Sequence, residues 1–435
     1  MSEHCKSHSP RNNLAQWLCY LETIHTIEID LGLSRMIIVA QRLNIDLSFA
    51  EVITVAGTNG KGTTCAFLEN ALLAEHKTIA VYSSPHIEKF NERLRINKVD
   101  VEDATFINAF AKIEKARGDI SLTYYEFTTL AAFIVLMTVR PQIIILEVGL
   151  GGRLDATNMI NADIAVITTI DLDHQAFLGN TRELIGFEKA GIMRSNHLAV
   201  LGDIDPTTSI INYAQEINAQ LKIRQQDFIV ENFSDHWSCS FEQLVLDKLN
   251  EPHIPQDNVA TALMVLHLLE VKLTNEKVNQ LIKVTKVAGR TELFKSNCDV
   301  LLDVAHNPQA ARYLAEHLSK IKKKDNYQRV IAVVGMLSDK DIDNTLKPMI
   351  AVVDDWYIGQ LSVPRSASAE NIYKHINNKL CSKSSTNGKL INCFDNITQA
   401  FKMASINTNE KDLIVVFGSF YTVAEIRRLI NSVNI

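Results

Sequence analysis

A short glycine-rich segment around a lysine has the composition of a phosphate-binding loop. Residues 57–64 read GTNGKGTT and lie between an apolar run at residues 52–56 and a segment with helical periodicity. Glycines let successive backbone N–H groups converge on an anion, and the N-terminus of the following helix adds its dipole. Lys61 can reach the outer phosphates of a nucleotide. The match to the usual G-x-x-x-x-G-K-[ST] pattern is imperfect, because Val55 replaces the first glycine and Gly62 replaces the serine or threonine.

The scarcity of glycine elsewhere makes this segment informative. Glycine supplies only 17 of the 435 residues, which is well below the usual share of about 7%. Three of these glycines lie in residues 57–62 and three more in residues 149–152. A tight turn between a strand and a helix, with no ligand, is the alternative interpretation of the first cluster.

A carboxylate stands in front of the second glycine cluster. Residues 143–146 are all apolar and end in Glu147. Ligands gather at the carboxyl edge of a parallel sheet, so a carboxylate there, beside a phosphate loop, is placed to bind Mg²⁺. The alternative is that Glu147 caps a turn or pairs with Arg153.

The apolar run at residues 164–170 is also followed by polar residues, DLDH at 171–174. His174 is a candidate metal ligand or water-holding residue, although a histidine in a loop often has neither role. Lys189 follows Glu188 in a segment with helical periodicity. The usual interpretation of such a pair is an ion pair on a solvent-exposed face of the helix. In the second half of the chain, Asp303 and Asn307 follow another apolar run, and helix capping explains them as well as nucleotide binding does.

The elements that position these residues alternate in type. Strand-length apolar runs and helix-period segments follow one another, which predicts βαβ units and a mainly parallel sheet. Residues 203–249 give a weaker and more mixed pattern. We expect strands at 52–56, 78–82, 142–148 and 163–170, and helices at 63–74, 102–116, 125–139, 257–269 and 275–286.

The alternation restarts after Gly289, which predicts a second, smaller α/β domain. We therefore expect a P-loop domain with a mainly parallel sheet over residues 1–293 and a Rossmann-like α/β domain over residues 294–435. The strands expected in the second domain lie at residues 299–304, 330–335, 355–358, 390–394 and 412–418.

The bulk composition excludes several classes of protein. A chain that is 46% hydrophobic and 22% charged, with a net charge of −6, is neither disordered nor attracted as a whole to nucleic acid. The seven cysteines are odd in number and contain no C-x-x-C pair, which argues against a disulfide framework and a zinc knuckle and favours a reducing compartment. The first residues contain no apolar signal core, and the apolar run at 130–139 is too short to span a bilayer. We expect a cytoplasmic protein without nucleic acid or membrane partners.

Taken in order, these segments resemble the folylpolyglutamate synthase/dihydrofolate synthase family, which is related to the Mur ligases. The longest matching pieces are GTNGKGTT at 57–64, LEVGLGGRLDATN at 146–158 and LDVAHNP at 302–308, and shorter pieces such as YSSPH at 82–86 lie between them. The family's loop carries a glycine after the lysine, so the imperfect match of Gly62 supports the resemblance. The similarity covers the chain from about Leu14 to its C-terminal helix.

The resemblance implies a role for individual residues. It implies that ATP is a co-substrate, that two Mg²⁺ ions are bound, and that Lys189 is carbamylated by CO₂ and takes part in catalysis with Lys61 and His174. The implied metal ligands are Ser84, Glu147 and His174. The implied ATP contacts are Thr58, Asn59, Gly60, Lys61, Gly62, Thr63, Asn258, Arg290, Asp303 and His306. The implied pterin contacts are Glu28, Ile29, Asp30, Thr123, Tyr124, Asp155 and Ala156.

The resemblance also implies the reaction. ATP phosphorylates a carboxylate, and the amine of L-glutamate attacks the acyl phosphate to form an amide. The substrates are dihydropteroate and reduced folates, and the segment at 153–158 looks like that of bifunctional bacterial members, so we expect both activities and a monomer. The alternatives are dihydrofolate synthase alone or a Mur-type peptidoglycan ligase, for which the chain before residue 57 is too short. An N-K-x-D sequence at 97–100 lies too early in the chain for a GTPase and is attributed to a turn.

Overall fold

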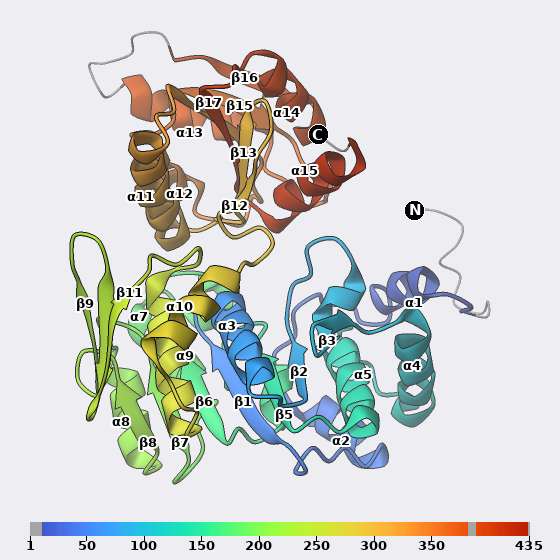
Figure 1. Ribbon diagram of the computed structural model, residues 1–435. Helices are drawn as coiled ribbons and strands as arrows, with labels where there is room; N and C mark the ends of the chain where they lie inside the picture. The colour runs from blue at the N-terminus through green and yellow to red at the C-terminus, as the bar shows by residue number, and fades with distance from the viewer. Residues whose placement is uncertain (1–10, 382–388, 434–435) are drawn as a thin grey trace. The chain divides into compact units, whose positions relative to one another are not determined.

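The computed structural model shown in Figure 1 describes residues 11–381 and 389–433. The chain divides into two compact units, Met1–Thr285 and Lys286–Ile435, and each is described by itself. This division falls before the boundary predicted at residue 293. Both units are α/β structures, as the sequence predicts.

The first unit is built on an eight-stranded sheet with the order β4-β3-β2-β5-β1-β6-β7-β8. The strands from β2 to β8 in this order are parallel, whereas β3 and β4 form an antiparallel edge. The mainly parallel sheet is therefore confirmed. The strands are β1 (Glu51–Ala56), β2 (Ile79–Tyr82), β3 (Leu94–Ile96), β4 (Val99–Asp100), β5 (Ile143–Glu147), β6 (Ile164–Ile167), β7 (Leu198–Leu201) and β8 (Gln220–Ile223).

Ten α-helices of this unit are among the described residues, and they cover the sheet on both faces. In β5, Ile144 and Leu146 face the core formed with α1, α2, α4 and α5, so the alternation of side chains turns Glu147 toward the other face. On that other face α3 packs beside α9. The helices are α1 (Leu14–Leu21), α2 (Ser34–Arg42), α3 (Lys61–Ala74), α4 (Asp103–Arg117), α5 (Tyr124–Val139), α6 (Gln175–Leu178), α7 (Arg182–Ala190), α8 (Thr208–Glu216), α9 (Gln256–Leu268) and α10 (Asn275–Val284).

Two features of the first unit lie outside the predicted alternation. The mixed pattern at 203–249 becomes α8, β8 and an antiparallel meander of β9 (Phe228–Asn232), β10 (Trp237–Phe241) and β11 (Leu244–Leu249). The N-K-x-D sequence becomes the turn of the β3–β4 hairpin, where Asn97 and Lys98 have φ angles of 49° and 68°. This places it in a turn, as expected.

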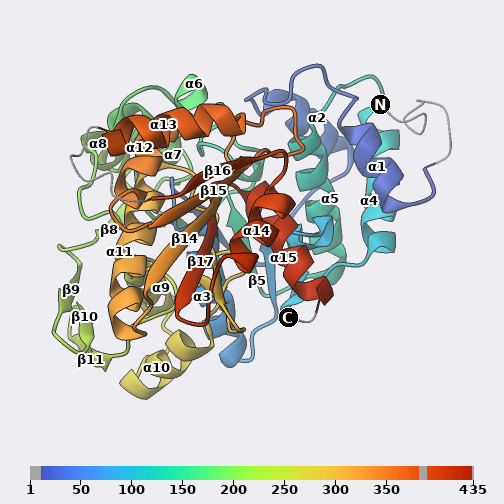
Figure 2. The same ribbon diagram turned by 90° about the horizontal axis from the view of Figure 1, so that it is seen from above.

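The second unit is a six-stranded sheet with the order β12-β13-β17-β14-β15-β16. Figure 2 shows α11, α12 and α13 on one face of this sheet and α14 and α15 on the other. All five predicted strands are present, and β12 is an additional antiparallel edge strand. The elements are β12 (Glu292–Phe294), β13 (Asp299–Leu302), α11 (Pro308–Lys324), β14 (Arg329–Val334), α12 (Ile342–Met349), β15 (Asp355–Gly359), α13 (Ala369–Cys381), β16 (Ile391–Phe394), α14 (Ile397–Ile406), β17 (Asp412–Phe417) and α15 (Phe420–Val433).

The cysteines and the helices test two expectations drawn from composition. Cys65, Cys239, Cys298 and Cys393 are free thiols. Within residues 11–381 and 389–433, every helix is too short or too polar to cross a membrane.

Candidate active site

The glycine-rich segment forms a loop between the end of β1 and the start of α3. Gly57 and Gly60 have φ angles of 153° and 87°, and Gly60 is the N-terminal cap of α3. The left-handed conformation of Gly60 favours glycine. The Lys61 ammonium donates to the carbonyl of Gly57 at 2.9 Å, so the lysine folds back over the loop. Backbone N–H groups at this helix start face the place where a phosphate can bind.

The first turn of α9 packs directly on this loop. The Asn258 amide donates to Thr63 Oγ1 at 2.8 Å, and Thr63 Oγ1 donates to the Gly60 carbonyl at 2.9 Å. A Cβ atom on Gly60 would lie 2.4 Å from Asn258 Oδ1. The structure therefore brings Asn258 together with Gly60 and Thr63, although almost two hundred residues separate them in the chain.

The other side of the loop is tied to the segment that follows β6. Thr58 Oγ1 donates to the Asp171 carbonyl at 3.0 Å, and the Thr58 N–H donates to the Thr169 carbonyl at 2.7 Å. Thr168 Oγ1 donates to the Asn59 carbonyl at 2.6 Å. The phosphate loop and the loop that carries His174 are thus one hydrogen-bonded assembly.

Glu147 lies beneath the start of α3. Its side chain is buried, and a Cβ atom on Gly62 would lie 3.7 Å from both of its carboxylate oxygens. The Glu147 carboxylate therefore lies directly against the residue that follows the loop lysine. Arg153 does not pair with Glu147, because its Nη2 lies 2.8 Å from Glu188 Oε1. The structure thus removes one of the two alternatives for Glu147.

Lys189 does not lie on a solvent-exposed helix face, so the interpretation of Glu188 and Lys189 as an exposed helical ion pair is wrong. Its side chain is buried with only 4% of its surface exposed. Burial, followed by the charge of Lys61, lowers its pKa to about 7, while Asp173 and Asp155 act in the opposite direction. Lys189, Lys61, Asp173 and Asp155 are therefore close enough in space to influence one another's charge.

The predicted metal ligands come from the ends of three neighbouring segments. Ser84 follows β2, Glu147 ends β5, and His174 caps α6 with a φ angle of 50°. His174 Nε2 lies 3.9 Å from Asp173 Oδ2. In the part of the chain that the structure describes, no three His, Cys, Asp or Glu side chains form a ready-made metal cluster. Oxygen donors fit Mg²⁺, which usually keeps waters and takes only one or two carboxylates plus substrate phosphates.

Sequence reasoning missed the residues that hold the loop of His174. The buried Asp203 carboxylate accepts from the Ile170 N–H at 2.6 Å, and Arg182 Nε donates to the Ile170 carbonyl at 3.0 Å. Arg182 also pairs with Asp203 at 3.4 Å. Both backbone groups of Ile170 are thus fixed by one ion pair, which we call the Ile170 clamp. Neither residue belongs to a recognisable motif, so no sequence signal could have found them.

Asp155, one of the predicted pterin contacts, is a buried hub. Its carboxylate accepts from the N–H groups of Gly149 and Leu150 at 3.0 and 2.8 Å and from Thr157 Oγ1 at 2.7 Å. The Tyr125 hydroxyl lies 3.4 Å away. Desolvation raises the pKa of Asp155, whereas these hydrogen bonds lower it. Asp155 orders the second glycine turn, and the adjacent Ala156 begins a short helix, Ala156–Met159.

The other predicted pterin contacts lie on two segments joined by Arg35. This arginine pairs with Asp30 and with Glu126 Oε1, the latter at 3.1 Å. Glu126 also forms a capping box with Thr123 at the start of α5. The predicted contacts Glu28, Ile29 and Asp30 are thereby linked to Thr123 and Tyr124. Sequence reasoning missed Arg35.

In the second unit, three predicted nucleotide contacts gather at the carboxyl edge of the sheet. The buried Asp303 accepts from the N–H groups of Thr291 and Ala305 at 2.8 Å each. Arg290 lies over the Phe420 ring at 5.0 Å, and His306 lies 5.9 Å from the same ring. Asn307 caps α11 by accepting from the Ala310 N–H at 3.0 Å. The capping interpretation is therefore confirmed for Asn307.

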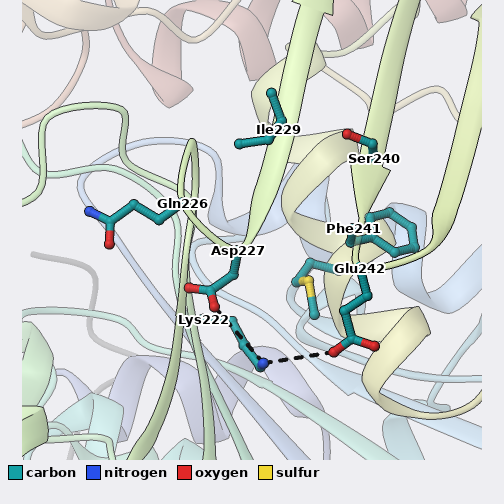
Figure 3. Close-up of a pocket in the computed structure, with 8 residues that line it drawn as sticks. Lys222, Gln226, Asp227, Ile229, Ser240, Phe241 and Glu242 are labelled. Carbon is teal, nitrogen blue, oxygen red and sulfur yellow. Dashed lines mark ion pairs between the residues drawn. The ribbon is translucent and has the colours of Figure 1, made fainter.

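A cavity of about 400 Å³ lies elsewhere in the first unit, between β8 and the β9–β11 meander. Figure 3 shows that Lys222 points between Asp227 and Glu242, and its Nζ lies 3.9 Å from each carboxylate. None of the predicted site residues lines this cavity. Its charges compensate one another, and it is not part of the candidate active site.

Comparison with known proteins agrees with this geometry. Residues 55–234 match the Mur ligase middle domain, and residues 289–420 match the Mur ligase glutamate ligase domain. A dihydrofolate synthase/folylpolyglutamate synthase of Escherichia coli is 42% identical over 96% of both chains. The structure of E. coli FolC in complex with DHPP and ADP is 41% identical, covers 98% of this chain and 100% of its own, and has a TM-score of 0.91.

A second solved structure adds ligands at the same level of similarity. It is a bifunctional folylpolyglutamate synthase/dihydrofolate synthase with Mn, AMPPNP and L-glutamate bound. It is 42% identical to this chain, covers 98% of this chain and 99% of its own, and has a TM-score of 0.87. With a phosphate loop, a carboxylate beneath it and full-length similarity to these proteins, the chain belongs to the dihydrofolate synthase/folylpolyglutamate synthase family of ATP-dependent ligases.

Proposed function

We propose that this protein uses ATP to join L-glutamate to the carboxylate of dihydropteroate and, in a second activity, to reduced folates. The observation that carries the proposal is the placement of the buried Glu147 carboxylate against the phosphate loop at Gly62. Full-length similarity to bifunctional relatives supports both activities. The proposed products are dihydrofolate and folates with a longer glutamate tail.

The first unit supplies the residues for phosphoryl transfer. The backbone N–H groups of Thr58–Thr63 hold the phosphates of ATP, and the Lys61 ammonium neutralises charge that develops on the transferred phosphoryl group. Phosphorylation converts the carboxylate hydroxyl, a poor leaving group, into phosphate, which departs when the glutamate amine attacks. His174 is the proposed acceptor of the proton that the amine must lose. In the second unit, Arg290, Asp303 and His306 contact the nucleotide.

The donor set of Ser84, Glu147 and His174 fits divalent metal ions, and we propose two Mg²⁺ ions. When bound, Mg²⁺ supplies positive charge to the phosphate oxygens. Relatives bound to Mn and AMPPNP support a divalent metal. A buried carboxylate at Glu147, next to Gly62 of the phosphate loop, is the feature of this chain that supports the assignment.

We further propose that Lys189 is carbamylated. A pKa lowered to about 7 leaves much of this amine unprotonated near neutral pH. The neutral amine can then form a bond to the carbon of CO₂ and release one proton, which gives a carbamate anion. A carbamate on Lys189 replaces a buried positive charge near Lys61 with a negative one, which is favourable. Mass spectrometry does not preserve carbamates well, so ¹³C NMR with ¹³CO₂ is the measurement that tests this modification, with Lys189→Met as the control.

The pterin is proposed to contact Glu28, Ile29, Asp30, Thr123, Tyr124, Asp155 and Ala156. We also propose that the protein acts as a cytoplasmic monomer without nucleic acid or membrane partners. Light scattering after size-exclusion chromatography measures the oligomeric state, and a dimer mass would contradict the proposal of a monomer.

The decisive experiment measures ADP release with ATP, Mg²⁺ and L-glutamate. Dihydropteroate, tetrahydrofolate and a UDP-muramoyl peptide are compared as acceptors, with Lys61→Ala as the inactive control. We expect both pterins to stimulate ADP release and the muramoyl peptide to have no effect. Stimulation by dihydropteroate alone would restrict the enzyme to the synthase activity, and stimulation by neither pterin would overturn the proposed function.

A further inference from the structure

Arg93 is a buried arginine in a segment that has no role in the reaction so far. It ends the short helix Phe90–Arg93, immediately before β3. Only 8% of its surface is exposed. Its Nε donates to His86 Nδ1 at 2.9 Å. Its guanidinium carbon lies 5.7 Å from the Phe90 ring centre and 5.5 Å from the Tyr124 ring centre.

No carboxylate balances the charge of Arg93. Across residues 11–381 and 389–433, no acidic side chain lies within ion-pair distance of it, and its two Nη nitrogens donate to no protein atom. His86 accepts on Nδ1, so this nitrogen carries no proton and the contact is not a charge pair. The adjacent Glu92 carboxylate instead accepts from the backbone N–H groups of residues 87–89.

The neighbouring Arg95 differs from Arg93, because its guanidinium has an ion-pair partner. Arg95 Nη2 lies 2.9 Å from the buried carboxylate of Glu69. Within the part of the chain that the structure describes, the Nη atoms of Arg93 are not among the fully buried polar atoms that lack a hydrogen bond, so they reach the surface, where an anion can bind them. Arg93 therefore has the properties of a cation held for an anionic ligand, with two free Nη donors in the geometry that binds a carboxylate through two hydrogen bonds.

The position of Arg93 identifies the kind of anion. Its backbone carbonyl accepts from the Ser83 N–H at 2.8 Å, so it lies beside the segment of the proposed metal ligand Ser84. Its side chain lies against Tyr124, a proposed pterin contact. Because the guanidinium lies next to a proposed pterin contact and near the segment of a proposed metal ligand, the anion that this position favours is the carboxylate of the pterin-bearing acceptor.

We propose that Arg93 binds the carboxylate of the acceptor substrate and that His86 is a positioning residue that orients the guanidinium. This assignment rests on the proposed function, because it requires an acceptor that carries a carboxylate and a pterin. Dihydropteroate is such an acceptor. Glutamate also carries carboxylates, and the experiment separates the two sources.

The experiment measures binding of dihydropteroate and of its neutral carboxamide to the full chain by calorimetry. In the wild-type protein we expect the carboxylate to bind about ten- to a hundredfold more tightly than the carboxamide, as for a hydrogen-bonded charge pair. Arg93→Met abolishes this preference, whereas Arg93→Lys retains part of it. The KM for ATP stays unchanged in both variants.

Thermal unfolding without ligand gives a second, independent readout. Arg93→Met leaves the melting temperature unchanged or raises it, because it removes an uncompensated buried charge. The matched control Arg95→Met lowers it, because it leaves Glu69 buried without its partner.

The outcomes separate this assignment from the proposed function. A wild-type enzyme that consumes no ATP with either pterin overturns the proposed function. A wild-type enzyme that is active, and whose Arg93→Met variant keeps the preference for the carboxylate, overturns the role of Arg93 alone. A variant with an unchanged preference and a raised KM for L-glutamate also overturns it, because the anion is then glutamate.

Discussion

The carboxylate of Glu147 and the missing side chain of Gly62 form one functional pair at the scale of single residues. Glu147→Gln keeps the shape of the side chain but removes the charge that a divalent cation needs. We expect kcat/KM for ADP release to fall by at least about a hundredfold, which corresponds to nearly 3 kcal/mol of transition-state stabilisation. The melting temperature without ligand should stay within about 2 °C of the wild type.

Glu188→Gln is the control for this prediction, because Glu188 pairs with the half-exposed Arg153. An isolated ion pair that reaches the surface contributes little to stability. The control should therefore keep near wild-type activity. Equal activity of Glu147→Gln and wild type would show that Glu147 holds no metal in turnover.

Lys189 should make stability depend on pH in a defined direction. Its folded pKa is about 7, whereas a lysine in an unfolded chain has a pKa of about 10.4. Between these values the unfolded chain binds the proton that the folded chain has lost, so the unfolding free energy rises with pH. The rise is at most about 1.4 kcal/mol per pH unit.

Urea unfolding at pH 7, 8 and 9 in CO₂-free buffer measures this dependence. Lys189→Met should have a smaller slope with pH than the wild type, since the titrating amine is gone. Added bicarbonate should flatten the wild-type slope, because a carbamate no longer titrates as an amine. Identical slopes for the two proteins in CO₂-free buffer would contradict the lowered pKa.

The sequence predicts the role of a residue that belongs to a motif, but not the role of a residue that acts through its contacts in the fold. Lys61 stands in a phosphate loop, and Glu147 ends an apolar run, so their types and positions indicate chemistry. Arg93, Arg182 and Asp203 have no such signal, because ordinary charged residues become special only through burial and through what they touch. The prediction that Lys189 lies on a solvent-exposed helix face was wrong for the same reason.

At the scale of elements, the Ile170 clamp couples α7 and the end of β7 to the loop that carries His174. Arg182→Ala removes the donor to the Ile170 carbonyl and leaves the buried Asp203 without its ion pair. We expect the KM for ATP to rise about tenfold or more, because the same loop fixes Thr58 through Asp171. Arg182→Lys should recover part of the loss.

Arg329→Ala is a matched control for the clamp. Arg329 also pairs with a buried aspartate, Asp412, at 2.7 Å, and donates to the backbone carbonyl of Asn407 at 3.0 Å. It lies at the beginning of β14, in the second unit and away from the carboxyl edge of its sheet. If both variants lose similar stability but only Arg182→Ala changes the KM for ATP, the clamp positions the loop. Equal KM values for ATP in the two variants would show that the Ile170 clamp contributes to stability only.

The alternation of apolar runs predicted most elements, because buried parallel strands are continuous apolar segments and the helices between them are long. Every expected strand of the parallel sheets is present within a few residues. The meander from β9 to β11 was not predicted, since its strands are short and carry mixed polar residues on their exposed side, as in β11. The β3–β4 hairpin is shorter still and rests on a turn with two left-handed residues.

At the scale of the whole molecule, the chain has more than one hydrophobic core. The core of α1, α2, α4 and α5 belongs to the first unit, whereas that of α11, α12 and α13 belongs to the second. A chain of this length exceeds what one core usually supports. The contacts divide the chain between Thr285 and Lys286, and the domain boundary expected at residue 293 stays a prediction.

Binding of nucleotide and metal should stabilise the folded chain by mass action. With AMPPNP and Mg²⁺ at a free concentration of one hundred times Kd, the expected stabilisation is about 2.7 kcal/mol. For domains of this size that raises the melting temperature by about 5–10 °C.

EDTA should remove most of this shift and abolish ADP release, since the phosphate oxygens then lose their cation while Lys61 and the loop N–H groups remain. Glu147→Gln should show the reduced shift even with Mg²⁺ present. A full shift that survives EDTA in the wild type would mean that the loop binds the nucleotide without metal, and would restrict the role of Glu147 to turnover.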